Sequence, residues 1–226
     1  AGISAESGIR TFRDANGLWE EHDVMEVASI DGWMRIPELV LRFYNQRRRQ
    51  LKEVSPNAGH TALVELESDF KVHIVTQNVD DLHERAGSSS ILHLHGELRK
   101  ARSTKDPSLV YDWPEDILLG DTCELGSQLR PHIVWFGEVV PKMEEAATLM
   151  SVADKVIIIG TSMQVYPAAG LVAYARPDAY IYYIDPKPSI NYELSDRRNL
   201  TVIPEKASAG VPILVSQLLE NSRMKD

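Results

Sequence analysis

Short apolar runs rich in β-branched residues recur along the chain, and each run is too short for a helix. They occupy residues 72–76, 133–136, 156–159, 180–184 and 200–203. Runs of this length that are almost free of charge are typical of strands buried on both faces of a parallel sheet. The pattern therefore predicts buried parallel strands at these places.

Apolar residues at helical spacing separate the runs. One stripe precedes residue 44, a second follows Asn57 and a third lies near the end of the chain: Ile36, Leu39, Val40 and Phe43; Leu63 and Leu66; Ile213, Leu214 and Leu218. Because strand and helix alternate, the predicted fold is α/β with a doubly wound parallel sheet. Residues 99–130 fit neither pattern, since prolines and charges interrupt their apolar residues, and we expect them to form a small inserted module.

The net charge is −9, from 33 acidic and 24 basic side chains. This balance repels a phosphate backbone, so no nucleic acid is expected as a partner. No apolar run approaches the roughly 20 residues that span a bilayer, and no basic-then-apolar leader opens the sequence, so neither a membrane partner nor export is expected. We expect a cytoplasmic monomer.

A single cysteine, Cys123, is present. One cysteine cannot form an intrachain disulfide, and it cannot supply the paired thiolates of a CxxC zinc site. The sequence therefore predicts no zinc.

The chain opens on the small residues AGISAESGI, followed by Phe12 between two arginines and then by Asn16, Gly17 and Trp19. A loop of small residues lets a backbone approach a diphosphate, and a helix can begin there with exposed N–H groups. The loop is not a GxGxxG fingerprint, and a tight turn is the alternative interpretation. In a nucleotide-binding fold an apolar strand feeds such a loop, so we expect a further strand before residue 1.

Polar side chains follow the first predicted strand. Gln77, Asn78 and Asp80 come directly after residue 76, where ligands bind in open α/β sheets. Their amide and carboxylate groups suit a ribose or a carboxamide. Alternatively, Asp80 caps the helix that follows, and both roles can hold together.

Two histidines end another strand in the sequence HLHGE. His93 and His95 share a face by the period of two, and Glu97 continues that face. They are either hydrogen-bonded structural histidines, or two ligands of a metal with Glu97 as the third, or they include a general base exposed by the following glycine. The residues alone leave these three interpretations open.

Hydroxyls, amides and a carboxylate lie at the ends of two later strands. Gly160, Thr161 and Ser162 follow the run at 156–159, and Asp185 follows the run at 180–184. An acidic side chain at this position of such sheets often binds a ribose hydroxyl.

Taken together, these segments resemble the sirtuins, the NAD-dependent protein lysine deacylases. The matching stretches, spread in order along the chain, are residues 1–13, TQNVD at 76–80, HLHG at 93–96, VWFGE at 134–138, GTS at 160–162 and KA at 206–207. The resemblance implies a Rossmann-like NAD-binding fold of the sirtuin type. It also implies an enzyme that consumes NAD and an acyl-lysine protein or peptide, yielding nicotinamide, free lysine and 2′-O-acyl-ADP-ribose.

The resemblance also assigns site residues. It makes His95 the catalytic base, with Asn78 and Asp80 holding the nicotinamide end. It implies NAD contacts from Ala1, Gly2, Ile3, Ala5, Phe12, Arg13, Trp19, Gln77, Asn78, Asp80, His95, Gly160, Thr161, Ser162, Asp185 and Ala207. The segment that pairs with the substrate backbone would include Val134, Phe136, Gly137 and Glu138.

Tyr44 and Arg47 bear on which acyl group is removed. They are three residues apart, so they share a helix face. In a subset of sirtuins a tyrosine and an arginine at this place bind the carboxylate of succinyl-, malonyl- or glutaryl-lysine, and a guanidinium suits that role. The alternative is a solvated cationic helix end, which is the interpretation we favour for Arg48 and Arg49.

The sequence departs from most sirtuins in lacking two CxxC pairs after the catalytic histidine. The module that zinc would stabilise must instead be held by packing of Tyr111, Trp113, Ile117 and Leu118. We expect one catalytic domain over residues 1–226. Its large part comprises 1–20, 57–96 and 132–226, and its small module comprises 21–56, which is helical and holds the acyl pocket, and the zinc-less 97–131.

Other functions remain as alternatives. They are a deacetylase with a broad acyl range, a protein ADP-ribosyltransferase, a nicotinamide oxidoreductase and an NAD-binding sensor without turnover. The intact His95 and Asn78 argue against the sensor, and the missing GxGxxG argues against the oxidoreductase.

Overall fold

Parallel strands form the larger part of the fold, as the apolar runs predict, although the run at 200–203 has no buried residue and its expected burial is wrong. The computed structural model describes residues 2–9, 18–19 and 22–224. Three strands form a parallel sheet in the order β10-β9-β8: Lys155–Ile159 (β8), Tyr180–Ile184 (β9) and Leu200–Ile203 (β10). A second parallel pair joins β3 (Ile74–Thr76) to β4 (Ile91–His93).

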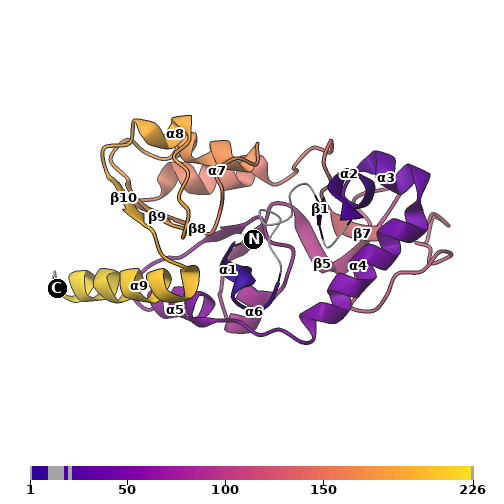
Figure 1. Ribbon diagram of the computed structural model, residues 1–226, viewed down its shortest axis with the longest axis horizontal. Helices are drawn as coiled ribbons and strands as arrows, with labels where there is room; N and C mark the ends of the chain where they lie inside the picture. Colours follow the sequence, from indigo (N-terminus) through magenta and orange to yellow (C-terminus); the bar gives the residue numbers. More distant parts are fainter. Residues whose placement is uncertain (1, 10–17, 20–21, 225–226) are drawn as a thin grey trace.

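Helices cover these strands on both sides (Figure 1). On one side, α5 (Ala58–Leu66) and α9 (Ala207–Arg223) pack in one apolar core with Ile74 and Ile184. On the other, α7 (Met143–Val152) and the 3-10 helix η2 (Ala168–Tyr174) enclose residues of β4. The doubly wound arrangement predicted from the alternation is therefore confirmed.

The predicted helices form, and one of them begins at a capping box. In α5, the Asn57 side chain accepts from the Gly59 N–H, and His60 accepts from the Asn57 N–H. The helix α4 (Pro37–Leu51) begins at a proline, whose missing N–H costs nothing in the first turn. Ile36 is therefore the residue before α4 and is exposed, so its place in the apolar stripe is wrong. Ile213 is also exposed, whereas Leu214 and Leu218 are buried.

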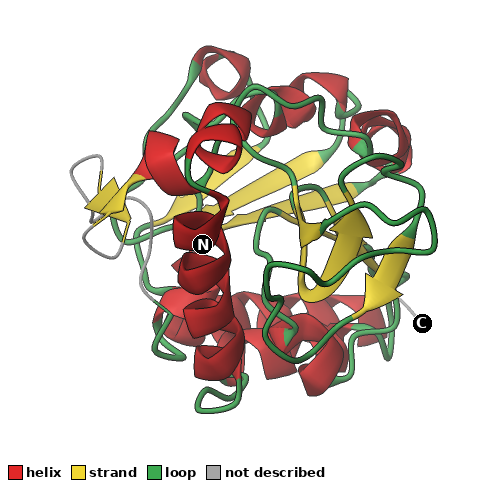
Figure 2. Ribbon diagram, turned by 90° about the vertical axis from the view of Figure 1, so that its right-hand side faces the viewer, coloured by secondary structure: helices red, strands yellow, loops and turns green. Residues whose placement is uncertain are grey.

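The elements within residues 24–51 and 96–133, called the small part below, combine helices with an antiparallel sheet (Figure 2). Its helices are α2 (Val24–Val27), α3 (Ile30–Arg35) and α4. Its strands run in the order β6-β5-β7, with bounds Gly96–Ser103 (β5), Val110–Asp112 (β6) and Leu129–Ile133 (β7). The parallel strand expected at 133–136 is therefore wrong: β7 ends at Ile133, and it pairs antiparallel with β5.

Apolar packing and one amide hold this sheet against α4. Ile117 is fully buried, and Tyr111 and Trp113 pack against the same core, as expected. The Asn45 side chain accepts from the Ile117 N–H at 2.9 Å and donates to its carbonyl at 2.9 Å. Leu118, in contrast, is 59% exposed, so the expectation that it contributes to the packing is wrong.

Short elements complete the described part of the chain: α1 (Gly2–Ala5), β1 (Leu18–Trp19), β2 (His22–Asp23), α6 (Leu82–Ala86) and α8 (Tyr192–Ser195). None of the helices in these residues is long and apolar enough to cross a bilayer.

Candidate functional site

Three of the predicted ligand-binding segments meet at the carboxyl ends of the parallel strands. Gly2 donates its N–H to the Gly160 carbonyl at 2.8 Å. The two backbones approach so closely that a Cβ on Gly2 would lie 2.5 Å from the Gly160 Cα, and a Cβ on Gly160 would lie 2.6 Å from the Gly2 Cα. Both glycines are therefore needed to bring the first loop against the end of β8.

The polar residues after β3 connect these segments. Asn78 donates from Nδ2 to the Ser4 Oγ at 2.8 Å, and Gln77 donates from Nε2 to the Thr161 Oγ1 at 3.3 Å. Asp80 is buried and accepts from the Leu82 N–H at 3.1 Å, so it satisfies the first amide of the next helix, whose N-cap residue is Asp81. The structure thus brings together residues that lie over 150 positions apart in the sequence.

His93 and His95 bind the neighbouring loop in the same way. Their Nδ1 atoms lie 3.1 Å from the Asn78 carbonyl oxygen and 3.2 Å from the Gln77 carbonyl oxygen. A carbonyl can only accept, so Nδ1 carries the proton in both rings. Each neutral ring would therefore have its lone pair on Nε2.

The two histidines differ at Nε2. That of His93 lies 2.6 Å from the Glu84 carboxylate, which outweighs the effect of burial and raises the pKa of His93. No described residue hydrogen-bonds to Nε2 of His95, and burial lowers the pKa of this ring. At neutral pH His95 is therefore the histidine that offers a lone pair.

Gly96 explains why the strand ends at this point. Its φ is +86°, which favours glycine, and a Cβ there would lie 2.0 Å from the His132 carbonyl oxygen. The chain turns at Gly96 into β5, and the Glu97 carboxylate still lies within 4.8 Å of a ring nitrogen of His93.

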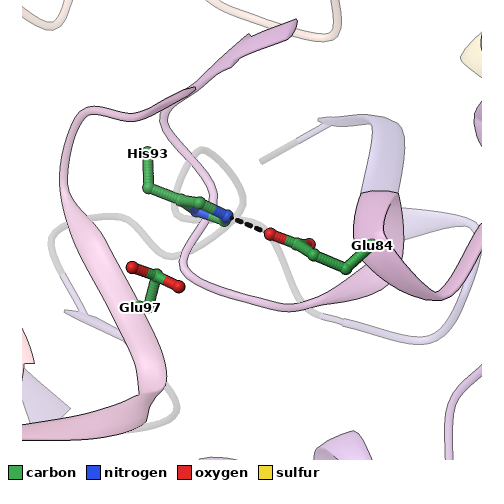
Figure 3. A group of neighbouring side chains, drawn as sticks. All are labelled: Glu84, His93 and Glu97. Atoms are coloured by element: carbon green, nitrogen blue, oxygen red, sulfur yellow. Dashed lines mark hydrogen bonds and ion pairs between the residues drawn. The ribbon is translucent and has the colours of Figure 1, made fainter. Parts of the chain in front are cut away.

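The group with metal-ligand chemistry in the described residues is Glu84, His93 and Glu97, whose ligand atoms lie within 4.8 Å of one another (Figure 3). His95, which the metal interpretation of the sequence included, is not part of it. Each member already has a protein partner, because His93 bonds to Glu84 and Glu97 pairs with Lys100 at 2.9 Å. The two carboxylates of the cluster therefore already have positively charged or hydrogen-bonding partners within the protein.

The remaining residues expected to hold the nucleotide lie on the same strand ends. Asp185 is 2% exposed and follows β9, with an oxygen accepting from the Lys187 N–H at 2.8 Å. Ala207 is the first residue of α9 and is buried, while Thr161 and Ser162 are partly exposed beyond β8. Ile3 is buried under this edge, and Ala5 ends the short helix α1.

Tyr44 and Arg47 are buried in the small part. Tyr44 is fully buried, and its hydroxyl accepts from the Trp135 Nε1 at 3.0 Å. Arg47 is 7% exposed, donates to the Phe43 carbonyl at 2.8 Å and stacks on the Phe43 ring at 3.7 Å. The alternative of a solvated helix end does not describe this pair. It describes Arg49, which is exposed and pairs with Asp116 at 2.6 Å, but it is wrong for Arg48, which is 2% exposed.

The segment 134–138 is anchored to both parts of the fold. Val134 donates its N–H to the His95 carbonyl at 2.9 Å, and Phe136 donates to the Ala28 carbonyl at 2.9 Å. Phe136 is 43% exposed, and Gly137 is exposed with a φ of +87° and open space around it. Phe136 and Gly137 are therefore the exposed residues of this segment.

Glu138 fixes this segment through a buried ion network. Its carboxylate accepts from Arg130 at 2.7 Å and from Arg102 at 3.0 Å, and also from the Trp135 N–H at 2.8 Å. Burial would raise the pKa of Glu138, but these donors outweigh it and hold the pKa below its ordinary value. Glu138 therefore stabilises the conformation of the segment through its contacts with Trp135 and the two arginines.

Replacing Glu138 by glutamine is expected to lower the free energy of unfolding by about 3–5 kcal/mol, because two largely buried guanidinium groups lose their carboxylate. Urea unfolding at pH 7 measures the change. The matched control is Glu145→Gln, whose exposed pair with Lys142 contributes about 1 kcal/mol or less. Equal losses in both variants would contradict the role given to Glu138.

Several expected contacts lie outside the described residues: Ala1, Phe12 and Arg13, together with the side chain of Trp19. Other residues were not expected from the sequence. Ser4, Glu84 and Arg130 each bond to a predicted site residue or to its neighbour. Of these three residues, only Ser4 could have been found from the sequence, because it lies within the loop of small residues.

Comparisons with known proteins agree with this geometry. The sequence profile described as the Sir2 family matches residues 1–167. An NAD-dependent protein deacylase of Helicobacter pylori is 61% identical, over 97% of this chain and 95% of its own length. A protein of the same description from Bacteroides thetaiotaomicron is 51% identical, over 97% and 95% respectively.

Solved structures are similar as well. A Sir2 homologue in complex with NAD has a TM-score of 0.87 and 35% sequence identity, covering 98% of this chain and 88% of that chain. A Sir2 mutant in complex with a p53 peptide and NAD has a TM-score of 0.77 and 28% identity, covering 99% and 91%.

Proposed function

Because this chain belongs to the Sir2 family, the sirtuins, and is an NAD-dependent protein deacylase, we propose that it removes succinyl, malonyl or glutaryl groups from lysine in preference to acetyl. The observation that carries this preference is the burial of Tyr44 and Arg47 on one face of α4. A buried guanidinium beside a phenol suits a terminal carboxylate and is a poor environment for a methyl group.

The residues at the strand ends fit NAD. Buried Asn78, Asp80 and Asp185 place polar groups at the carboxyl edge of parallel strands, where a nucleotide binds in this class of fold. Gln77, Thr161 and Ser162 would line the same edge, with Gly2, Ile3 and Ala5 on the first loop and Ala207 at the start of α9. When bound, NAD supplies the electrophilic ribose carbon that accepts the acyl oxygen and releases nicotinamide.

In this proposal His95 is the general base. Its Nδ1 is fixed by the Gln77 carbonyl and its Nε2 carries a lone pair, so it can take a proton from a ribose hydroxyl and later return it. His93 cannot substitute, because Glu84 holds its Nε2 in an ion pair. Asn78 and Asp80 would orient the nicotinamide end, and Asn78 is itself held by Ser4.

The acyl-lysine substrate would enter beside the segment 134–138. Its backbone would pair with the exposed segment at Phe136 and Gly137. Pairing of this kind recognises the substrate through main-chain hydrogen bonds and therefore tolerates many sequences. Trp135 links this segment to the acyl pocket, because its Nε1 donates to the Tyr44 hydroxyl. The substrate segment and the acyl-binding residues are therefore in direct contact.

The deciding experiment compares matched peptides carrying acetyl-, malonyl-, succinyl- and glutaryl-lysine. With saturating NAD, kcat/KM for the acidic acyl groups is expected to exceed that for acetyl by about tenfold or more, as one charge-assisted interaction provides. Nicotinamide release and peptide mass measure turnover. Equal values for acetyl- and succinyl-lysine would make the protein a deacylase of broad range and overturn the acyl preference.

A further inference from the structure

A small cavity lies on the face of the molecule formed by α4, α6 and β5. Its volume is about 150 Å³, and it is lined by Arg48, Leu51, Lys52, Asp81, Arg85, Arg99 and Pro114. This is less than the about 300 Å³ at which pockets for drug-sized ligands begin. The cavity therefore suits a small ligand and not a nucleotide.

The lining is strongly cationic although the chain as a whole carries a net charge of −9. Four of the seven lining residues are arginine or lysine, and Asp81 is the single acidic one. Asp81 is shared, lying 2.9 Å from Arg99 and 3.7 Å from Arg85. No carboxylate among the described residues pairs with Lys52, so the cavity keeps an excess of positive charge.

Arg48 makes this a preformed site. It is 2% exposed, and its two terminal nitrogens donate to neutral oxygens: Asn45 Oδ1 at 2.9 Å and the Lys100 carbonyl at 3.3 Å. Its Nε has no hydrogen-bond partner among the described residues. The nearby Asp116 is bound to Arg49 instead. A buried guanidinium without an ion-pair partner is costly and attracts an anion.

Arg85 is held rigidly at the opposite wall. It donates to the Leu51 carbonyl at 3.0 Å and to the Val54 carbonyl at 2.6 Å, so α6 is fastened to the end of α4. Lys52 and Arg99 are exposed at the mouth of the cavity. The cavity therefore has hydrogen-bonded arginines at its walls and exposed cations at its mouth.

We propose that this cavity binds a small phosphate-bearing anion. Phosphate carries a charge of about −1.5 to −2 and three acceptor oxygens, which match several cations arranged around a small volume. A bound phosphate would bridge α4 to α6 and β5, and so join the helix that carries Tyr44 and Arg47 to the loop that carries Asn78 and Asp80. The proposal does not depend on which acyl group the enzyme prefers.

The test is calorimetric titration of the purified protein with inorganic phosphate at constant ionic strength, with saturating NAD present. The NAD keeps phosphate out of the nucleotide site. The double variant Lys52→Gln/Arg99→Gln is expected to bind phosphate about tenfold more weakly or worse, since each charge-assisted hydrogen bond contributes about that factor. The control Lys71→Gln/Arg198→Gln also removes one lysine and one arginine, both exposed, and is expected to match the wild type.

Each outcome is decisive. Saturable binding that is lost in Lys52→Gln/Arg99→Gln and kept in the control supports the proposal. No saturable binding to the wild type, or equal binding to both double variants, overturns it. Succinate binding as tight as phosphate binding, and lost in the same Lys52→Gln/Arg99→Gln variant, would overturn the assignment to phosphate. Because both changed residues lie at the surface, circular dichroism of the variants is expected to match the wild type.

Discussion

Replacing His95 by alanine is expected to lower kcat for deacylation by about 1,000-fold, because a positioned general base contributes about 10²–10⁴ to the rate. The Nδ1 contact to the Gln77 carbonyl holds the ring in one tautomer and leaves a lone pair on Nε2. Nicotinamide release and peptide mass, followed with a succinyl-lysine peptide and NAD, measure the loss. NAD affinity, measured by calorimetry, is expected to change much less.

The matched control for this variant is His73→Ala. His73 bonds to the Ser90 hydroxyl at the surface and lies away from the strand ends that carry the site. The pH profile of the wild type gives a second readout. Burial lowers the pKa of His95, so its unprotonated form persists below the ordinary histidine pKa of about 6.5. We therefore expect the midpoint of the acid limb of the kcat/KM profile to lie below that pH. Deacylation at the wild-type rate by His95→Ala would rule out the proposed base.

Replacing Arg47 by methionine is expected to lower kcat/KM for succinyl-lysine by about 100-fold, because the carboxylate of the bound succinyl group loses its charged partner. Methionine keeps much of the packing against Phe43 while removing the charge. Activity on acetyl-lysine is expected to fall little or to rise, since that substrate brings no carboxylate. The ratio of the two kcat/KM values therefore separates a loss of specificity from a loss of the enzyme.

Arg42→Met is the control on the same helix. Arg42 is exposed, so its replacement removes the same charge and leaves the buried face of α4 intact. We expect this variant to keep the wild-type preference. If Arg47→Met and Arg42→Met both retained it, the carboxylate of the acyl group would have to bind elsewhere, although the deacylase activity itself would stand.

The parallel sheet could be predicted from the sequence because its strands are almost purely apolar. The run that became β9 lies between two strands and buries Ile181, Tyr183 and Ile184, and such burial leaves a direct trace in the residue types. The run that became β10 has the same kind of sequence but no buried residue, because it lies at the edge of the sheet. The antiparallel sheet of the small part could not be predicted in this way. In β5, Arg102 and Ser103 are buried because they bond to Glu138 and Ser127, so polar residues interrupt the apolar pattern of that strand.

The choice between the two histidines shows a similar limit. His93 ends β4 and His95 follows it, and both bond to the same neighbouring loop, as a shared face predicts, but they lie before the same glycine and look alike in the sequence. What separates them is Glu84, nine residues before His93 and on another element. Arg48 shows the same effect, because the partners that allow its burial are Asn45 on the same helix and a carbonyl of β5.

The contact between Gly2 and Gly160 has a consequence for sequence variation in the family. At most pairs of touching residues, enlargement of one side chain can be balanced by reduction of the other, and the two positions covary. Here neither partner can become smaller, and a Cβ on either one would overlap the backbone of the other. We therefore expect the pair to be invariant without covarying, so that methods based on correlated substitutions would overlook one of the tightest contacts in the site.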